Sequence, residues 1–285
     1  MIALHNENLD VQISPAGAEL KSIRDTYSSF EYLWQADKTW WGRTAPVLFP
    51  VVGKLKNDAL RVNGHSFAMT QHGFARDCAF DLIEHTADLA VFELKHNQHT
   101  LTLYPYAFAL RIRYVLHQRS VGCTWQVVNS GTQPMYFSIG AHPGFNFVHG
   151  AMNEYELHIQ TSGSLRQLHL SGGLFLPDTT AFNQSCIQLS TDVFKNDALV
   201  LEAEGITGAQ LVHRHSPHRV GMQWSGFSYL GIWSPAHCTN FVCIEPWCGR
   251  ADNATGHSDI STKPGMIKLE AGSTFERSYT MQFES

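Results

Sequence analysis

Apolar and polar residues alternate with a period of two through much of the chain. In the segment 107–116, one face includes Arg111 and Arg113, and the other is wholly apolar or aromatic, with Phe108, Leu110, Ile112, Tyr114 and Leu116. The same alternation recurs in the segments 123–127, 154–160 and 275–283. A period of two is the pattern of strands with one buried face, so we predict half-buried antiparallel strands in all four segments.

Turn-forming residues separate the alternating segments. They cluster at Asn63-Gly64, Asn129-Ser130-Gly131, Ser162-Gly163, Ser171-Gly172-Gly173 and Ala271-Gly272. Only Thr191–Leu199 has the pattern of a short helix, with Thr191 or Asp192 as its N-cap. Without long amphipathic helices between strands, a parallel βαβ fold is disfavoured. Because neither a repeat nor a linker interrupts the pattern, we predict one all-β domain over residues 1–285, a large antiparallel β-sandwich.

Composition narrows the class of protein. A chain of 285 residues with 44% hydrophobic residues can bury a core that needs no disulfide or metal for stability. The net charge of -5 and the absence of like-charge runs argue against nucleic-acid binding. The apolar stretch Ala45–Val52 is too short, and too interrupted by proline, to span a membrane. The N-terminal residues do not resemble a signal peptide, so we expect a cytoplasmic protein.

Two sets of potential metal ligands are interpreted as structural. The six cysteines are expected to be buried thiols in a reducing compartment. The spacing of Cys238, Cys243 and Cys248 is wider than the C-x₂₋₄-C pairs of structural zinc sites, so we expect no metal there. His213, His215 and His218 have a spacing that could bind a metal, but no carboxylate partner is nearby in the sequence and Ser-Pro marks a loop. We therefore interpret this segment as a solvated turn.

Two histidines stand in glycine-rich segments. His72 lies in the run 71–77 (QHGFARD), and a neighbouring glycine allows the backbone to approach a ligand closely. An ordinary turn histidine is the competing interpretation. His142 lies in the run 138–146 (SIGAHPGFN), where a strand end is expected to turn sharply. Because histidine has an unperturbed pKa of about 6.5, His142 is a candidate proton donor, with a structural histidine as the alternative.

Glu245 breaks the apolar pattern of its segment. Alternation places Phe241, Cys243 and Glu245 on one face, and Glu245 ends the strand beside Pro246. Burying a carboxylate on such a face costs free energy unless the carboxylate is paired with another group or has a function in a site. A salt-bridged structural glutamate is the alternative, but Pro246 and Trp247 look like the wall of a small pocket, and tryptophan faces suit the C–H surfaces of sugars.

Taken together, these segments resemble the aldose 1-epimerase (galactose mutarotase) superfamily, especially its LacX-like branch. The resemblance covers nearly the whole chain and rests on ordered motifs at consistent spacing. They are GAELKS at 17–22, EYLWQ at 31–35, WGRTAPVLFPVVG at 41–53, HGFAR at 72–76, GAHPGF at 140–145 and EPW at 245–247.

The resemblance implies an antiparallel β-sandwich with its sugar site in an open cleft. The catalytic glutamate of the family falls on Glu245, its acid histidine on His142, and the histidine that holds the sugar ring on His72. The family's substrate-binding arginine lies ten residues before the glycine of the next turn. That glycine is Gly64 in this chain, so the arginine position falls on Lys54. This is a departure, because lysine lacks the rigid bidentate fork of arginine. The substrate-binding aspartate falls on Asp197.

The activity implied is the interconversion of the α and β anomers of an aldohexose by ring opening and closure. Glu245, ionised at neutral pH, is expected to act as general base on the C1 hydroxyl. His142 is expected to act as general acid on the ring oxygen, with a pKa raised by the nearby carboxylate. The reaction needs no nucleophile, metal or redox cofactor, and its only expected partner is a monosaccharide.

Three alternatives remain open. Arg43 and Arg76 stand in motifs that also resemble the phosphosugar-specific branch, and two arginines at the cleft mouth would suit a hexose 6-phosphate. Each arginine could instead form a structural pair, as Arg76 with Asp77. The second alternative is a non-catalytic sugar-binding protein on the same scaffold. The third is a glycosidase, which needs a second carboxylate opposite Glu245, and Asp197 is the candidate.

Overall fold

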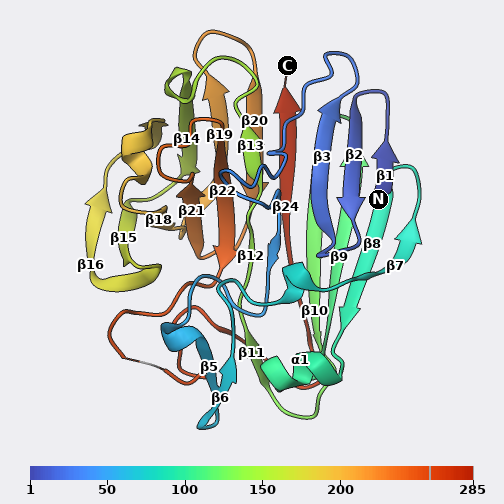
Figure 1. Cartoon of the computed structure of the whole chain (residues 1–285), viewed down its shortest axis with the longest axis vertical. Coiled ribbons are helices and arrows are strands. Elements are labelled where there is room, and N and C mark those ends of the chain that lie inside the picture. Colours follow the sequence, from blue (N-terminus) through green and yellow to red (C-terminus); the bar gives the residue numbers. More distant parts are fainter. Residues whose placement is uncertain (257, 285) are drawn as a thin grey trace.

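The computed structural model describes residues 1–256 and 258–284, and antiparallel strands dominate it (Figure 1). Across the described residues, the largest sheet has nine strands in the order β17-β14-β19-β20-β24-β10-β9-β8-β7. The strands in that order are β17 (Cys186–Gln188), β14 (Tyr155–Thr161), β19 (Ile206–His213), β20 (Arg219–Trp224), β24 (Thr274–Glu284), β10 (Ser120–Asn129), β9 (Phe108–His117), β8 (Leu89–Lys95) and β7 (Asp81–His85).

A second large sheet has the order β16-β15-β18-β21-β22-β12-β4, and β13 also pairs with β22. Its strands are β16 (Leu174–Phe182), β15 (Leu165–Ser171), β18 (Leu199–Glu202), β21 (Tyr229–Trp233), β22 (Phe241–Cys248), β12 (Ile139–Ala141), β4 (Val47–Leu48) and β13 (Gly144–Asn146).

Smaller elements complete the fold. The three-stranded sheet of β1 (Ile2–His5), β2 (Leu9–Ser14) and β3 (Glu19–Asp25) and the pairs β5 (Ala59–Val62) with β6 (His65–Ala68) and β11 (Met135–Phe137) with β23 (Ile267–Leu269) are also antiparallel. The helices are α1 (Gln98–Leu103) and the 3₁₀ turns η1 (Lys56–Asp58), η2 (Ala75–Asp77), η3 (Met152–Glu154) and η4 (Thr191–Phe194). None of the helices in the described residues is long and apolar enough to cross a membrane.

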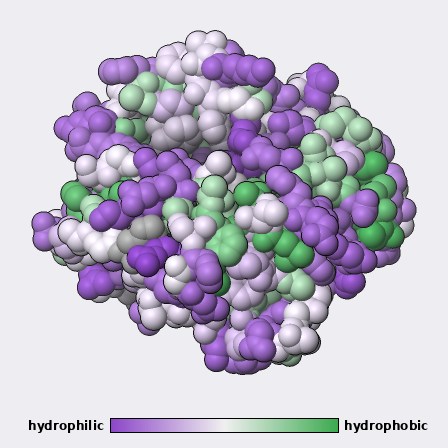
Figure 2. All heavy atoms as spheres, turned by 60° about the horizontal axis from the view of Figure 1, so that its bottom comes forward, coloured by the Kyte–Doolittle hydropathy of each residue, from purple (hydrophilic) through white to green (hydrophobic). Residues whose placement is uncertain are grey.

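The main core lies between the two large sheets. Trp125 and Met281 of the nine-stranded sheet belong to the same buried cluster as Leu230 and Ile244 of the second sheet. This packing of sheet on sheet confirms the predicted antiparallel β-sandwich. Hydrophilic residues predominate on the face seen in Figure 2, with hydrophobic residues in small groups between them, as expected once the apolar strand faces are buried.

Strand β22 is buried on both faces, which decides where the functional site lies. Its alternate residues Val242 and Ile244 face the main core. On the other face, Phe241 and Cys243 join a separate buried cluster, and Trp247 joins a third one. Period-two alternation places Glu245 on this second face, which points away from the nine-stranded sheet.

The predicted strands are confirmed, whereas the predicted helix is wrong. The four alternating segments lie in β9, β10, β14 and β24. Residues Thr191–Leu199 form only the short 3₁₀ turn η4, and Ser190 takes its N-cap position without a side-chain cap. Asp197, at φ +83°, cannot continue a right-handed helix. The chain's α-helix is instead α1, which Asn97 caps through a capping box with Thr100.

The histidine segment between β19 and β20 is a turn, as predicted, but it is only partly solvated. Of its three histidines, His215 is exposed, whereas His213 and His218 are buried. The His213 Nε2 atom lies 3.6 Å from a carboxylate oxygen of Glu154, a partner that is 59 positions away in the chain and was missed for that reason. All six cysteines are free thiols, and four of them are buried as predicted, but Cys78 is half-buried and Cys186 is exposed.

Candidate active site

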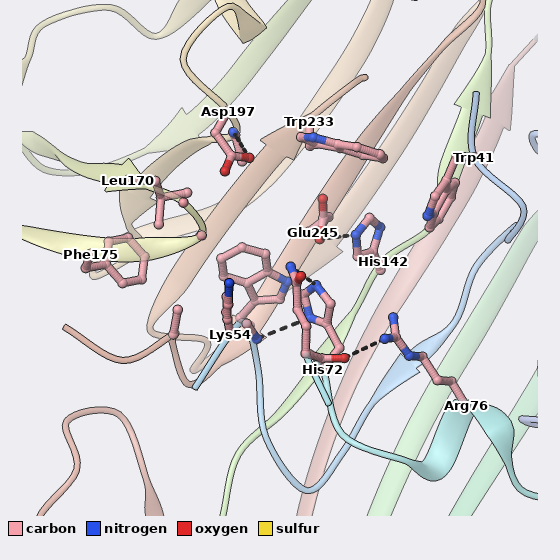
Figure 3. A pocket seen from close by; sticks show the side chains of 17 residues that line it. Trp41, Lys54, His72, Arg76, His142, Leu170, Phe175, Asp197, Trp233 and Glu245 are labelled. Atoms are coloured by element: carbon pink, nitrogen blue, oxygen red, sulfur yellow. Dashed lines mark hydrogen bonds and ion pairs between the residues drawn. The ribbon is translucent and has the colours of Figure 1, made fainter. Parts of the chain in front are cut away.

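A cavity of about 440 Å³ opens on the outer face of β22 (Figure 3). Its lining comes from widely separated parts of the chain: Trp41, Gly53, Lys54, Gln71, His72, Arg76, His142, Leu170, Gly172, Gly173, Phe175, Asp197, Ala198, Trp233, Glu245, Trp247 and Ala251. Six of the seven residues predicted to form the site therefore line one cavity, and Arg43 does not.

The ladder beside Glu245 is interrupted where the cavity lies. Strand β12 pairs with β22 through Gly140 and Trp247, and β13 resumes the pairing at Gly144 and Cys243. Between these pairs the neighbouring chain turns through His142 and Pro143, while β22 carries Glu245 and Pro246. Proline has no amide hydrogen for the ladder, so the two prolines suit this gap. The interruption lets side chains from both segments meet.

Glu245 and His142 form the floor of the cavity. The His142 Nε2 atom lies 3.2 Å from Glu245 Oε2, which is an ion-pair distance, and both side chains are buried. His142 Nδ1 and Glu245 Oε2 have no hydrogen-bond partner. A buried polar group without a partner is costly, so this pair retains unused hydrogen-bonding capacity at the floor.

Burial sets the protonation of this pair. It lowers the pKa of His142 to about 3 and raises the pKa of Glu245 well above its ordinary value of 4.5. The expectation of an ionised Glu245 that raises the pKa of His142 is therefore wrong, because burial shifts both pKa values in the opposite direction. Desolvation of both charged forms outweighs their attraction, so the neutral carboxyl and the neutral imidazole are favoured.

His72 is held in one orientation by the backbone of Gly53. The Gly53 amide donates to His72 Nδ1 at 3.1 Å, and the His72 amide donates to the Gly53 carbonyl at 2.9 Å. Nδ1 is thus an acceptor, and burial lowers the pKa of this histidine well below 6.5, so the proton of the neutral ring lies on Nε2. The side-chain nitrogen of Gln71 lies 3.2 Å from His72 Nε2, so Gln71 is the neighbour of this donor at the cavity.

The glycine after His72 has a different purpose from the one expected. Gly73 adopts φ +73°, and a Cβ there would lie 2.2 Å from the carbonyl oxygen of Phe49. Gly73 therefore allows a close contact with the Phe49 backbone, not with a ligand. His72 itself has φ +68°, a left-handed conformation that histidine adopts more readily than most residues.

Trp247 lies flat across its neighbouring strands. A Cβ on Gly140 would lie 2.6 Å from Cδ1 of the indole, and a Cβ on Gly231 would lie 2.5 Å from Cζ2. Glycine on both flanking strands thus makes room for the ring. Among the described residues, the buried indole Nε1 makes no hydrogen bond of good geometry. Its N–H is nevertheless close enough to Glu245 to lower the pKa of that carboxyl, against the larger effect of burial.

Two further tryptophans enclose His142. The ring of Trp41 stacks on the imidazole with centroids 4.7 Å apart, and the ring of Trp233 meets it edge-on at 5.8 Å. His72 contacts the imidazole from another side, at 5.4 Å. Figure 3 shows Trp41 and Trp233 on one side of the cavity, and Leu170 and Phe175 on the other. The walls are therefore largely aromatic, with polar groups at the floor.

Lys54 and Asp197 bring opposite charges to the cavity. Among the described residues, no hydrogen bond or ion pair engages the Lys54 ammonium. Its side-chain stem passes Gly173, where a Cβ would lie 3.3 Å from Lys54 Cδ. Asp197 is exposed, and its carboxylate accepts from the Ala198 amide at 2.8 Å. Asp197 also raises the pKa of Glu245, which places its charge within electrostatic reach of the floor.

The two arginines do not converge on the cavity. Arg43 is held by Asp77, with Nη2 2.7 Å from Oδ1, and lies outside the lining. Arg76 does line the cavity, and its Nη2 donates to the Gln71 carbonyl at 2.5 Å. Burial and the neighbouring Arg43 lower the pKa of Arg76 to about 10. The predicted pairing of Arg76 with Asp77 is weak, at 4.0 Å, because Arg43 is closer.

Sequence reasoning missed part of the lining. Gly172 and Gly173 were assigned only to a turn, yet this tight turn between β15 and β16 borders the cavity. Trp41 and Trp233 were not singled out, although Trp41 begins the motif that contains Arg43. Contacts between residues so far apart in the chain leave no local signal, so tryptophans of the cavity cannot be told from tryptophans of the core.

The arrangement is suited to moving protons on a small polar ligand. A carboxyl and an imidazole in contact provide one acid and one base, and both lie buried at the floor between aromatic walls. Metal binding at the floor is less favourable. One ligand atom each from His142, Cys243 and Glu245 lie within 4.8 Å of one another, but burial raises the pKa of the Cys243 thiol well above 9 and disfavours the thiolate that would bind a metal.

Comparisons with known proteins agree with this geometry. The family model described as aldose 1-epimerase matches residues 1–282. The chromosomal protein LacX of Lactococcus lactis subsp. lactis is 34% identical over 292 residues, covering 98% of this chain and 97% of that protein. A galactose mutarotase related enzyme from Lactobacillus acidophilus superposes with a TM-score of 0.96 at 34% identity, covering 99% of this chain and 97% of that one. A galactose mutarotase-like protein from Lactobacillus casei gives 0.95 at 30% identity over 100% of both chains. The chain belongs to the aldose 1-epimerase family.

Proposed function

We propose that the protein is an aldose 1-epimerase that interconverts the α and β anomers of a free aldohexose. The observation that carries this proposal is the contact of His142 with Glu245, 3.2 Å apart at the floor of an aromatic-walled cavity. Membership of the family supports a sugar substrate and an isomerase reaction. The cavity of about 440 Å³ is within the size range of small-molecule sites.

In the proposed reaction, Glu245 removes the proton of the C1 hydroxyl while His142 protonates the ring oxygen. The bond between C1 and the ring oxygen breaks, and an open-chain aldehyde forms. Rotation about the C1–C2 bond presents the other face of the aldehyde. The ring oxygen then attacks C1 and loses its proton to His142, while Glu245 returns a proton to the C1 oxygen. No atom is gained or lost, and both residues return to their starting state.

One shared proton reconciles this mechanism with the neutral pair that burial favours. The neutral pair and the pair of carboxylate with imidazolium contain the same number of protons and differ only in where one of them lies. Hydroxyl donors of a bound sugar, together with the Trp247 N–H, would stabilise the carboxylate and move the proton to His142. Each form provides one acid and one base, as a reversible ring opening requires.

The remaining polar residues are proposed to hold the sugar hydroxyls. His72 offers a donor at Nε2 in a fixed ring orientation, and Lys54 offers an ammonium with no other partner among the described residues. Asp197 would accept hydrogen bonds from hydroxyls at the exposed end of the cavity. Arg76, held at the Gln71 carbonyl, offers its remaining N–H groups.

A phosphorylated hexose is a weaker candidate. It was suggested by Arg43 and Arg76 together, but Arg43 is turned to Asp77 outside the cavity. Lys54 and Arg76 remain as cations of the lining, and a phosphate would have to bind between them without the paired guanidinium groups that suit it.

Anomer exchange measured by NMR tests the proposal. Magnetisation transfer between the anomeric signals of glucose, galactose and their 6-phosphates is recorded with and without the protein in the same buffer. We expect faster exchange for at least one free hexose, and a smaller acceleration for its 6-phosphate. Acceleration of the 6-phosphates alone would favour the phosphosugar alternative. Sugar binding without any acceleration would indicate a binding protein and contradict the proposal.

A further inference from the structure

A second group of ionisable side chains lies on the edge of the nine-stranded sheet, on residues that do not line the cavity. Glu156 and His158 are two residues apart on β14, so their side chains share one face. Cys186, on the outermost strand β17, is directly opposite His158 in the ladder. Burial alternates along β14, and this face is partly exposed, with the thiol of Cys186 exposed as well.

The three side chains converge on one point. His158 Nε2 lies 2.9 Å from Glu156 Oε2, and Cys186 Sγ lies 3.5 Å from the same oxygen. One ligand atom from each residue lies within 4.8 Å of the other two. In this arrangement the carboxylate accepts two hydrogen bonds, from an N–H and an S–H, and the two hydrogens occupy the space between the ligand atoms.

We propose that Glu156, His158 and Cys186 form a binding site for a divalent transition-metal ion, with zinc as the best-suited ion. Tetrahedral zinc with bonds of about 2.0–2.3 Å to oxygen, nitrogen and sulfur places ligand atoms roughly 3.3–3.6 Å apart. The sulfur–oxygen distance of 3.5 Å already fits, and the nitrogen–oxygen distance of 2.9 Å needs to open by only a few tenths of an ångström. Water completes the tetrahedron from the exposed side.

The donor set determines which ions bind. Thiolate and imidazole ligands favour zinc and its neighbours in the transition series, whereas magnesium and calcium prefer sites made of oxygen ligands. Little positive charge lies near the site to repel a metal ion. Besides His158, Arg214 is the cation that acts on Glu156, and Arg214 Nη2 donates a hydrogen bond to the Asn153 carbonyl at 2.9 Å. Burial and the Glu156 carboxylate raise the pKa of the Cys186 thiol, so the thiol binds the ion by releasing its proton. The neutral His158 ring releases no proton, because its N–H moves to Nδ1 when Nε2 binds the ion.

A bound ion would also stabilise the segment that leads to the cavity. Strand β17 has only three residues and pairs with β14 alone. The chain continues from it through η4 to Asp197 and Ala198, which line the cavity. A metal that joins Cys186 to β14 would therefore cross-link this edge strand to the sheet and raise the resistance of the fold to heat.

Titration of the full chain with Co²⁺, a spectroscopic substitute for Zn²⁺, tests the site. Wild-type protein is expected to develop the thiolate-to-cobalt charge-transfer absorption, and Zn²⁺ is expected to abolish it by competition. Cys186→Ser should remove the band, and His158→Gln should weaken Co²⁺ binding on the order of 100-fold or more. The matched controls Cys78→Ser and His169→Gln, at a half-buried thiol and a partly exposed histidine outside the cluster, should leave the titration unchanged.

Three results would overturn the proposal. They are the absence of a charge-transfer band in the wild-type protein, a band that persists in Cys186→Ser, and a band that Cys78→Ser removes. A charge-transfer band that persists in Cys186→Ser would assign the ion to another thiol, such as Cys243 at the cavity floor. Anomalous scattering from a wild-type crystal soaked in Zn²⁺ locates the ion without any variant and must place it between Glu156, His158 and Cys186. Because neither readout measures sugar turnover, the outcome is independent of the proposed epimerase activity.

Discussion

His142 Nε2 lies 3.2 Å from Glu245 Oε2, although the two residues are 103 positions apart in the chain. They meet because the ladder on one side of β22, between its pairing with β12 and its pairing with β13, is open for a few residues. Pro143 and Pro246 both lie in that opening and cannot donate ladder hydrogen bonds. The same residues that appear as motifs in the sequence are thus the ones that interrupt the sheet and create the site.

The pH dependence of catalysis follows from the burial of this pair. Catalysis needs one proton on the pair, so it fails at low pH when a second proton binds, and at high pH when the last proton leaves. Since burial lowers the pKa of His142 to about 3, the second proton binds only near that pH. We expect kcat/KM not to fall on acidification from pH 6 to about pH 4. Far-UV circular dichroism over the same range checks that the protein stays folded. A decline on acidification with its midpoint at 4.5 or above would contradict this assignment.

The Trp247 N–H is expected to contribute to catalysis. Trp247→Phe keeps an aromatic face in the cavity and removes the donor, which costs roughly 0.5–1.5 kcal/mol for a hydrogen bond. We expect kcat/KM to fall about 3- to 10-fold, measured by polarimetry. The control is Trp224→Phe, because Trp224 Nε1 is likewise buried without a partner but lies on β20, outside the cavity. Equal effects of the two substitutions would show that the N–H has no specific function in the site.

The position of the Trp247 ring depends on Gly231. In Gly231→Ala, the new Cβ would lie 2.5 Å from the indole, so the ring must shift into the cavity or the strand must move. We expect a loss of stability of about 1–3 kcal/mol and a clear fall in activity. In the matched variant Gly122→Ala, on β10, the nearest atom to the new Cβ is 3.9 Å away, and activity should be retained. Unchanged activity in Gly231→Ala would mean that the ring position does not matter.

Lys54 is expected to act in binding rather than in chemistry. Lys54→Ala should raise KM for the sugar severalfold and leave kcat nearly unchanged, because a hydrogen bond to a distant hydroxyl is equal in the ground and transition states. Lys54→Arg should retain part of the affinity. Lys268→Ala, an exposed lysine paired with Glu270, serves as the control. A loss confined to kcat would place Lys54 in the chemical step instead.

The sequence predicted the architecture well because period-two alternation is a local signal. The strands β9, β10, β14 and β24, which all belong to the nine-stranded sheet, could be predicted from that pattern. The sandwich was predicted from the turn clusters between alternating segments and from the lack of long helices between them. The helix at 191–199 was predicted wrongly. Its apolar spacing fits a helix, but Asp197 adopts φ +83°, a left-handed conformation that the spacing does not indicate. Helix α1 was missed because its signal is a single cap, Asn97, on a very short segment.

The site was predicted less completely than the fold. Glu245, His142 and His72 stand in motifs, and the structure brings them to one cavity, but their roles stay predictions. The protonation of the pair could not be derived from the sequence, because desolvation depends on burial by distant residues such as Trp41 and Trp233. Arg43 was misassigned to the cavity because its partner, Asp77, is 34 positions away and takes its guanidinium.

The measurement that tests the central claim most directly is anomer exchange by the variant Glu245→Gln. Glutamine keeps the shape of the side chain and removes its ability to take or give the proton. We predict a fall in the exchange rate of about 10²–10⁴-fold relative to the wild-type protein, while sugar affinity, measured by calorimetry, changes little. An exchange rate in Glu245→Gln equal to that of the wild-type protein, on the same freshly dissolved α-sugar, would contradict the account.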